Sequence, residues 1–258
     1  MSGEVLGVVP ARLSSTRLPR KPLHPLLGKP LIEWVWRRVR CLSVLDHALV
    51  ATDSVEVADV CRALGAPVEL TAPEHPSGTD RVAEVANMPR YRDFEVIVNV
   101  QGDEPLVEGG HVRSAVDLVR QDGWQVGTCA TPLRTLESLA DPSVVKVVRA
   151  TSGRALYFSR APIPHVRGGH PSSEELCEAP FLRHIGLYAY GRSALNDWVS
   201  LKPSRMEQIE ALEQLRPLEA GLRIGLSVVG AAAGGVDTPA DVARMEEQLS
   251  RLTQPTAV

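Results

Sequence analysis

The regular alternation of apolar runs with amphipathic stretches is the feature that most constrains how this chain folds. Val5–Val9 is a short apolar run that ends at Pro10, and Glu95–Val100 is the strongest buried-strand signal in the chain. Short continuous runs of this kind are typical of strands buried on both faces of a parallel sheet. Because amphipathic stretches separate the runs, we expect an α/β fold with a mostly parallel central sheet and helices on both faces.

Weaker patterns predict the remaining elements. Strands are expected at residues 48–52, 68–70, 126–131, 144–149, 155–158, 185–190 and 224–229. Helices are expected to begin near Pro30, Ser54, Thr79, Arg205 and Pro239, and the fourth extends to Gly221. Ile163–Pro180 is rich in Pro, Gly, Ser and His and predicts a long loop, which in a compact domain is usually functional or mobile. With no internal repeat and no clear linker, we expect one domain over residues 1–258 with a smaller inserted subdomain over approximately 130–190.

Composition and charge exclude several classes of protein. The 258 residues are 44% hydrophobic and 23% charged, which allows an ordinary core and argues against disorder. The formal net charge of −3 argues against a nucleic-acid partner. No run reaches the roughly 20 apolar residues of a membrane span, and the N-terminus lacks a secretory signal pattern. The four cysteines form no CxxC pair, so we expect free thiols in a cytoplasmic protein.

One basic segment stands out in this mildly acidic chain. The stretch Val5–Ile32 contains no acidic residue, and most of its basic side chains fall in PARLSSTRLPRKPL, residues 10–23. This loop directly follows the first expected strand, where open α/β sheets bind ligands. The cationic groups of Arg12, Arg17 and Lys21, with three hydroxyls between them, suit a triphosphate. A solvated basic surface loop is the alternative, but its position and its stiffening prolines favour an anion site.

Two familiar phosphate-binding patterns are absent from the sequence. There is no GxxxxGK[ST] motif and no GxGxxG after the first expected strand, so neither a P-loop nor a dinucleotide-binding site is supported. What remains is an enzyme that holds phosphates with basic side chains rather than with glycine amides.

Two aspartates are candidates for a Mg²⁺ site. Asp103 lies in Gln101-Gly102-Asp103-Glu104-Pro105 at the end of the most apolar strand, and Asp237 lies in Gly235-Val236-Asp237-Thr238-Pro239. Carboxylates at such strand ends can hold Mg²⁺ against substrate phosphates. A strand-ending turn at Asp103 and a helix cap formed by Asp237 or Thr238 are the alternative interpretations. The histidines and Cys177 fit no zinc-ligand spacing.

The chain resembles the 3-deoxy-manno-octulosonate (Kdo) cytidylyltransferase family, also called CMP-Kdo synthetases. The resemblance runs nearly end to end and is carried by motifs in order. These are residues 10–23, Ala51-Thr52-Asp53, Ser77-Gly78-Thr79-Asp80-Arg81, 99–105 (NVQGDEP), 145–148, 157–164 (YFSRAPIP), 181–190 (FLRHIGLYAY), 209–216 (IEALEQLR) and 235–239 (GVDTP).

The resemblance implies a Rossmann-like nucleotidyltransferase fold, a homodimer formed through the inserted subdomain, and a role in lipopolysaccharide biosynthesis. It implies Mg²⁺-dependent transfer of CMP from CTP to the anomeric hydroxyl of Kdo, with release of pyrophosphate. Arg12, Lys21, Asp103 and Asp237 are then the catalytic residues, and the two aspartates hold the metal. The expected nucleotide contacts are Ala11, Arg12, Arg17, Lys21, Ser77, Gly78, Arg81 and Asp103. The expected sugar contacts are Gln101, Arg160, His184, Tyr188 and Glu213, with Arg160 as partner of the sugar carboxylate.

Several alternatives stay open at this point. The family usually has Gly where Arg20 stands, which bears on the backbone before Lys21 and adds a cation near the phosphates. Residues 163–180 are divergent, so another acidic sugar such as 8-amino-Kdo or a sialic-acid-like substrate is the second hypothesis. A non-catalytic nucleotide-binding module is the third. Since only 4% of the residues are aromatic, we expect cytosine to be bound by hydrogen bonds rather than by stacking.

Overall fold

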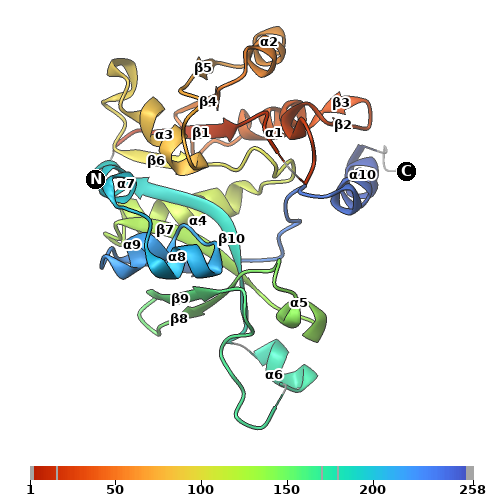
Figure 1. Ribbon diagram of the computed structural model, residues 1–258, viewed down its shortest axis with the longest axis vertical. Helices are drawn as coiled ribbons and strands as arrows, with labels where there is room; N and C mark the ends of the chain where they lie inside the picture. Colours follow the sequence, from red (N-terminus) through yellow and green to blue (C-terminus); the bar gives the residue numbers. More distant parts are fainter. Residues whose placement is uncertain (1–2, 16, 170, 179, 254–258) are drawn as a thin grey trace. The chain divides into compact units, whose positions relative to one another are not determined.

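The computed structural model describes residues 3–253 apart from residues 16, 170 and 179, and it is a mixed α/β structure (Figure 1). A mostly parallel central sheet is flanked by helices, which confirms the predicted fold class. The chain forms two compact units. The first unit contains residues 6–92, 99–107 and those from 233 onward, and the second contains residues up to 5, 93–98 and 108–232. The inserted subdomain expected over approximately 130–190 stays a prediction.

The first unit is built on three parallel strands. These are β1 (Val5–Ala11), β4 (His47–Thr52) and β5 (Val68–Leu70), with β4 paired to both of the others. Val5, Val8 and Val9 of β1 have no exposed surface, as expected for a strand covered on both faces. The backbone N–H of Val100 donates to Val8 O at 3.0 Å, and this bond brings the segment after β6 against β1.

Among the described residues, four α-helices belong to the first unit. They are α1 (Leu31–Val39), α2 (Val55–Ala63), α3 (Gly78–Ala86) and α10 (Pro239–Thr253). Ser54 caps α2 as predicted, because its side chain accepts a hydrogen bond from Val57 N–H, and Gly65 follows the helix with a φ of 68°. The basic loop contains the short 3₁₀ helix η1 (Lys21–Leu23) and the hairpin β2 (Pro25–Leu26) and β3 (Lys29–Pro30). A second 3₁₀ helix, η2, spans Pro89–Tyr91.

The second unit has β7 (Val126–Pro132) at its centre. This strand pairs in parallel with β11 (Ile224–Val228) and antiparallel with β10 (Leu182–Gly191). β8 (Lys146–Arg149) pairs antiparallel with β10 and with β9 (Ala155–Ser159), and β6 (Val96–Asn99) neighbours β10. The helices of this unit include α4 (Gly109–Arg120), α5 (Leu136–Ala140) and α7 (Arg192–Ser200).

Two predictions about the second unit are wrong in detail. The predicted loop 163–180 contains the helix α6 (Ser173–Glu178), because Leu176 is buried in a cluster with Leu133, Leu139 and Phe181. The predicted helix 205–221 is two helices, α8 (Arg205–Glu210) and α9 (Leu215–Glu219). The break falls at Ala211, which adopts a left-handed φ of 50° that an α-helix cannot continue through.

None of the helices in the described part of the chain is both long and apolar enough to cross a membrane. Cys41, Cys61 and Cys129 are free thiols, as predicted. The side chain of Cys177 lies outside the described residues.

Candidate active site

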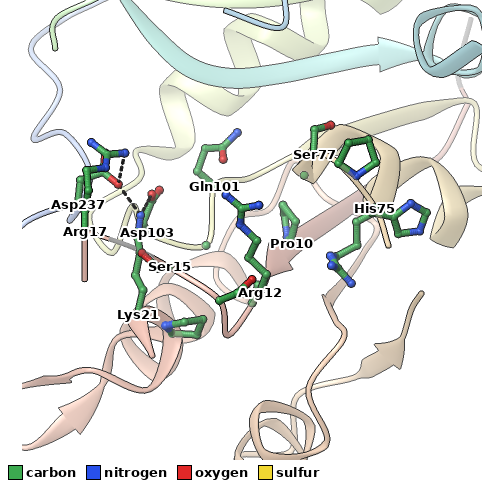
Figure 2. A pocket seen from close by; sticks show the side chains of 17 residues that line it. Pro10, Arg12, Ser15, Arg17, Lys21, His75, Ser77, Gln101, Asp103 and Asp237 are labelled. Carbon is green, nitrogen blue, oxygen red and sulfur yellow. Dashed lines mark hydrogen bonds and ion pairs between the residues drawn. The ribbon is translucent and has the colours of Figure 1, made fainter. Parts of the chain in front are cut away.

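A cavity of about 790 Å³ opens in the first unit, beside the carboxyl end of β1 (Figure 2). Its walls come from four places in the sequence: the basic loop, the segment before and within α3, and each of the two predicted aspartate motifs. The lining residues are Pro10, Ala11, Arg12, Ser14, Ser15, Arg17, Lys21, Pro22, His75, Pro76, Ser77, Gly78, Arg81, Gln101, Gly102, Asp103 and Asp237. The cavity therefore brings together every nucleotide-binding and catalytic residue predicted from the sequence, and Gln101 from the predicted sugar contacts.

Lys21 joins the two predicted metal ligands. Its Nζ donates hydrogen bonds to Oδ2 of Asp103 and, at 2.7 Å, to Oδ1 of Asp237 (Figure 2). The Lys21 side chain is only 16% exposed. Burial by itself lowers the pKa of the Lys21 ammonium, but the charges and hydrogen bonds of Asp103 and Asp237 outweigh it and raise the pKa above its ordinary 10.5. Lys21 is thus a firmly charged cation held between two carboxylates.

The backbone around Arg20 places Lys21. Arg20 adopts φ 56° and ψ 34°, which is the left-handed region, and Leu23 N–H closes the following turn onto Arg20 O at 2.8 Å. A residue without a Cβ carries least strain there, so the glycine that the family resemblance leads us to expect at this position suits the backbone better than arginine. The Arg20 guanidinium pairs with Glu56 at the start of α2, so it is engaged in an ion pair rather than directed to the cavity lining.

A glycine places Asp103. A Cβ on Gly102 would lie 2.4 Å from the carbonyl oxygen of Pro10, so only glycine lets this segment pass so close to the end of β1. The turn is closed by Glu104 N–H, which donates to Gln101 O at 3.2 Å. The close approach brings the Asp103 carboxylate to the loop that carries Lys21.

Asp237 reaches the same point from the other end of the chain. Val236 N–H donates to Asp103 O at 2.9 Å, which joins the two aspartate-bearing segments through their backbones. Arg17 adds an exposed ion pair, with its Nη2 3.1 Å from Asp237 Oδ1. Thr16, one of the three predicted hydroxyls, lies outside the described residues.

The donor set suits a hard divalent cation. In the described residues no three His, Cys, Asp or Glu side chains gather as a metal site, and the two carboxylates converge on one ammonium. Mg²⁺ typically takes one or two protein carboxylates and fills its other positions with water and substrate phosphate. Asp103 and Asp237 fit that pattern, and the ammonium that they share shows that both can face one cation.

Arg12 lies between this cluster and the α3 side of the cavity, as Figure 2 shows. It is exposed, in contrast to the buried Ala11 before it. A guanidinium in this place can pair with phosphate oxygens bidentately.

The α3 side of the cavity is formed by a helix N-terminus. Ser77 caps α3 by accepting a hydrogen bond from Asp80 N–H, and Gly78 begins the helix. Arg81 is 2% exposed and is held by Asp53 at 2.9 Å, by the Thr71 hydroxyl and by Ala72 O. Arg81 therefore fixes the wall of the cavity through its ion pair with Asp53.

The other predicted sugar contacts belong to the second unit. The Arg160 guanidinium donates to three backbone carbonyls, those of Glu210 at 2.7 Å, Pro142 at 2.9 Å and Ala211 at 3.2 Å. Its assignment as partner of a sugar carboxylate stays a prediction, and most of its donors already have acceptors.

His184, Tyr188 and Glu213 form a second group in that unit. Burial lowers the pKa of His184 to about 3; its Nε2 lies 3.0 Å from Thr128 Oγ1, and its ring contacts Phe158 and Tyr188. Burial, followed by the charges of Tyr190 and Glu213, raises the pKa of Tyr188 well above 10, and among the described residues its hydroxyl has no hydrogen-bond partner. Their role in sugar binding likewise stays a prediction.

Comparison with known proteins identifies the family. The cytidylyltransferase family model matches residues 6–224. A 3-deoxy-manno-octulosonate cytidylyltransferase of Gemmatimonas aurantiaca is 51% identical over 241 residues, which cover 93% of this chain and 92% of that protein. The chain belongs to the 3-deoxy-manno-octulosonate cytidylyltransferase family. It is therefore a nucleotidyltransferase, as predicted.

Further relatives agree with this assignment. The 3-deoxy-manno-octulosonate cytidylyltransferase of Alkalilimnicola ehrlichii is 45% identical over 252 residues, covering 96% of this chain and 97% of that one. A solved structure of CMP:2-keto-3-deoxy-manno-octonic acid synthetase complexed with CTP matches with a TM-score of 0.87 at 36% identity, covering 96% and 99% of the two chains. A cytidylyltransferase from Leptospira borgpetersenii has a TM-score of 0.63 at 14% identity over 98% and 89% of the two chains, which shows the shared fold alone.

One titratable residue that lines the cavity of this cytidylyltransferase was not predicted from the sequence. His75 lines the α3 side, and its Nε2 contacts the Glu84 carboxylate, which also accepts Ala72 N–H at 2.9 Å. Burial tends to raise the pKa of Glu84, but the hydrogen bonds from His75 and Ala72 outweigh it and lower the pKa. The signal available was the position of His75, two residues before the Ser77-Gly78 motif.

Proposed function

We propose that this chain transfers CMP from CTP to the anomeric hydroxyl of Kdo and releases pyrophosphate, with Mg²⁺ as the required metal. The observation that carries the proposal is the convergence of Lys21, Asp103 and Asp237 at one cavity, beside Arg12. Two carboxylates for a divalent cation and two cations for a polyphosphate are what nucleotidyl transfer requires. The choice of CTP and Kdo as substrates is supported by the names of relatives that match nearly the whole chain.

The chemical step forms one bond and breaks one. The anomeric oxygen of Kdo attacks the α-phosphorus of CTP, the bond from that phosphorus to the bridging oxygen breaks, and pyrophosphate leaves while the hydroxyl proton passes to solvent. Negative charge grows on the phosphoryl oxygens during this step, so catalysis is mainly positioning and electrostatic stabilisation. Arg12 and Lys21 supply positive charge to the triphosphate, and Arg17 assists from the exposed side of the loop.

Asp103 and Asp237 are the residues that hold Mg²⁺. When bound, the metal supplies positive charge to the phosphates and lowers the pKa of the attacking hydroxyl. Lys21 bridges both carboxylates, and we expect its ammonium to pair with the phosphates instead when nucleotide and metal are bound.

The cytidine half of CTP binds on the α3 side, next to Ala11, Ser77 and Gly78. Of the described residues that line the cavity, His75 is the only one with an aromatic ring, which favours recognition of cytosine by hydrogen bonds. Arg81, tied to Asp53, keeps this wall in place. The sugar acid is bound by Gln101, Arg160, His184, Tyr188 and Glu213.

The cellular setting follows from the reaction. An activated Kdo is used in lipopolysaccharide biosynthesis, so we place this chain in the cytoplasm. We also propose the homodimer that the family resemblance implies, joined through the segment at approximately 130–190. A light-scattering measurement of molar mass checks the dimer independently of activity.

The test is pyrophosphate release from CTP, measured with and without Kdo and over a range of Mg²⁺ concentrations. Release that depends on both supports the proposal, and no Kdo-dependent release at any Mg²⁺ concentration contradicts it. A panel with 8-amino-Kdo and a sialic acid compares kcat/KM values and decides between Kdo and another acidic sugar. A non-catalytic module would bind CTP in a calorimeter and release no pyrophosphate with any of them.

A further inference from the structure

Asp241, in the first turn of α10, reaches back to the metal-binding loop. Its Oδ2 accepts three hydrogen bonds: from Asp237 N–H at 3.1 Å, from Thr238 N–H at 2.9 Å and from the Thr238 hydroxyl at 2.8 Å. Thr238 in turn accepts Asp241 N–H at 3.3 Å, which completes a reciprocal cap of the helix. A cap alone needs only Thr238 and the Asp241 side chain. The additional hydrogen bond from Asp237 N–H restrains the backbone of the proposed metal ligand itself.

Arg244 holds Asp241 in this position. Its Nη1 lies 2.7 Å from Asp241 Oδ1, and its Nη2 donates to Gly235 O at 3.1 Å. The arginine thus joins Asp241 to Gly235, the first residue of the short segment 235–238. The Asp241 side chain is 19% exposed, so its carboxylate is partly shielded from water while it makes these bonds.

The opposite side of the segment is fixed by the other aspartate. Val236 N–H donates to Asp103 O, and a Cβ on Gly235 would stand 3.4 Å from Asp103 O and from Asp103 Oδ1. Consecutive backbone N–H groups at 236, 237 and 238 are therefore bound, the first by Asp103 and the next two by Asp241. Residues 230–237, which precede this anchor, adopt neither helix nor strand. The direction of the Asp237 side chain, itself 40% exposed, thus depends on these anchors.

We propose that Asp241 is a positioning residue for Asp237, which it holds in the place where Asp237 and Asp103 can share one divalent cation. The proposal rests on the proposed function, because it takes these two aspartates as the metal ligands. Groups that orient a metal ligand typically change metal affinity 10- to 100-fold when removed, since the ligand must then be ordered at the moment of binding. Loss of Asp241 weakens metal binding without removing any group that touches the nucleotide.

The test measures the affinity of the protein for CTP by calorimetry, once in Mg²⁺ and once in EDTA. The ratio of the two affinities is the gain that Mg²⁺ gives, and it is measured without turnover. In Asp241→Ala we expect that gain to fall at least ~10-fold, toward its value in Asp237→Asn, with the affinity in EDTA within about 2-fold of wild type. Asp241→Asn keeps an oxygen that accepts the same N–H groups, so it retains most of the gain. Glu247→Ala, which removes the partner of Arg251 on the same helix, is the matched control and leaves the gain unchanged.

Two outcomes overturn the proposal. One is an undiminished Mg²⁺-dependent gain in Asp241→Ala; a lower Tm in the same variant would then make Asp241 a helix cap only. The other is the absence of any gain in the wild-type protein. If Asp241→Ala does not fold, Arg244→Ala is measured instead; it removes a 47% exposed side chain, and a gain equal to wild type there contradicts the proposal. A gain that is lost in Asp237→Asn and Asp241→Ala, in a protein that does not transfer CMP to Kdo, would support the positioning role while refuting the proposed function.

Discussion

Nζ of Lys21 lies 2.7 Å from Oδ1 of Asp237 across 216 positions of sequence. The same ammonium also donates to Asp103, so one cation occupies the point where both carboxylates converge. Lys21 therefore neutralises the charge of the two carboxylates that would hold a divalent metal.

Replacing Lys21 changes the affinity of the site for the metal and for the nucleotide. In Lys21→Met the carboxylates lose their shared cation, and we expect Mg²⁺ to bind at least ~10-fold more tightly in the absence of CTP, about 1.4 kcal/mol. The affinity for CTP falls in the same variant because a cation for its phosphates is gone. Calorimetric titration of Mg²⁺ without nucleotide is the measurement. Lys29→Met, which removes a lysine that lies over Trp34, is the control, and equal Mg²⁺ affinities in wild type and Lys21→Met would contradict the competition.

Gly102 is required by a close backbone approach. In Gly102→Ala the new Cβ meets Pro10 O at 2.4 Å, so the segment carrying Asp103 must move away from β1. We expect kcat/KM for CTP to fall about 100-fold, since displacement of a reacting group by about 1 Å can cost that much. Gly110→Ala in α4, where a Cβ meets nothing within 4 Å, is the matched control and keeps wild-type activity. Similar kinetics for the two variants would show that the approach is unimportant.

The cavity could be predicted from the sequence to a large extent because of where its motifs lie. The basic loop after β1 and Asp103 after β6 both follow strands that were evident as apolar runs. The contact between Lys21 and Asp237 could not be read from spacing, because the local pattern at Asp237 is fully explained by a helix cap. In the structure, the hydrogen bond from Val236 N–H to Asp103 O brings the two aspartate-bearing segments together.

Other elements were missed because their stability comes from packing. Helix α4 was not predicted, because it begins with Gly109 and Gly110, residues of low helix propensity. It nevertheless forms, with Val112, Ala115 and Val116 buried. The prediction of a single helix over 205–221 was wrong because the amphipathic spacing continues through Ala211. The backbone of Ala211 has a positive φ, which ends the helix there.

The left-handed conformation of Arg20 predicts an unusual order of stabilities. Arg20→Gly and Arg20→Ala both lose the exposed ion pair with Glu56, but only the alanine variant keeps a Cβ at φ 56°. We expect the glycine variant to have the higher free energy of unfolding, by about 1 kcal/mol. Urea titration of the pair measures the difference directly. At Arg62, within α2, the same two substitutions serve as a control in which alanine is the more stable, and an alanine advantage at both positions would contradict the strain at Arg20.

Acid should destabilise the protein through His184. Burial lowers its pKa to about 3, against 6.5 for the free side chain, so between these values the unfolded state binds more protons than the folded state. The contribution of the neutral His184 ring to the free energy of unfolding is thus fully present above pH 6.5. This contribution is lost as the pH falls toward 3, by up to about 1.4 kcal/mol per pH unit. Urea unfolding of His184→Gln at pH 7.0 and 5.0 should show a smaller loss than wild type. His165→Gln, at an exposed position, should keep the wild-type loss, and an unchanged loss in His184→Gln would contradict the assignment.

The account is tested most directly by ³¹P NMR of a reaction containing CTP, Mg²⁺ and Kdo. Attack at the α-phosphorus predicts that the three CTP signals give way to one CMP-sugar phosphodiester and an equimolar amount of pyrophosphate, only when Kdo is present. Asp103→Asn and Asp237→Asn should leave the CTP signals unchanged over the same time. Formation of CDP and inorganic phosphate, or persistence of CTP in the wild-type reaction, would contradict cytidylyl transfer to Kdo.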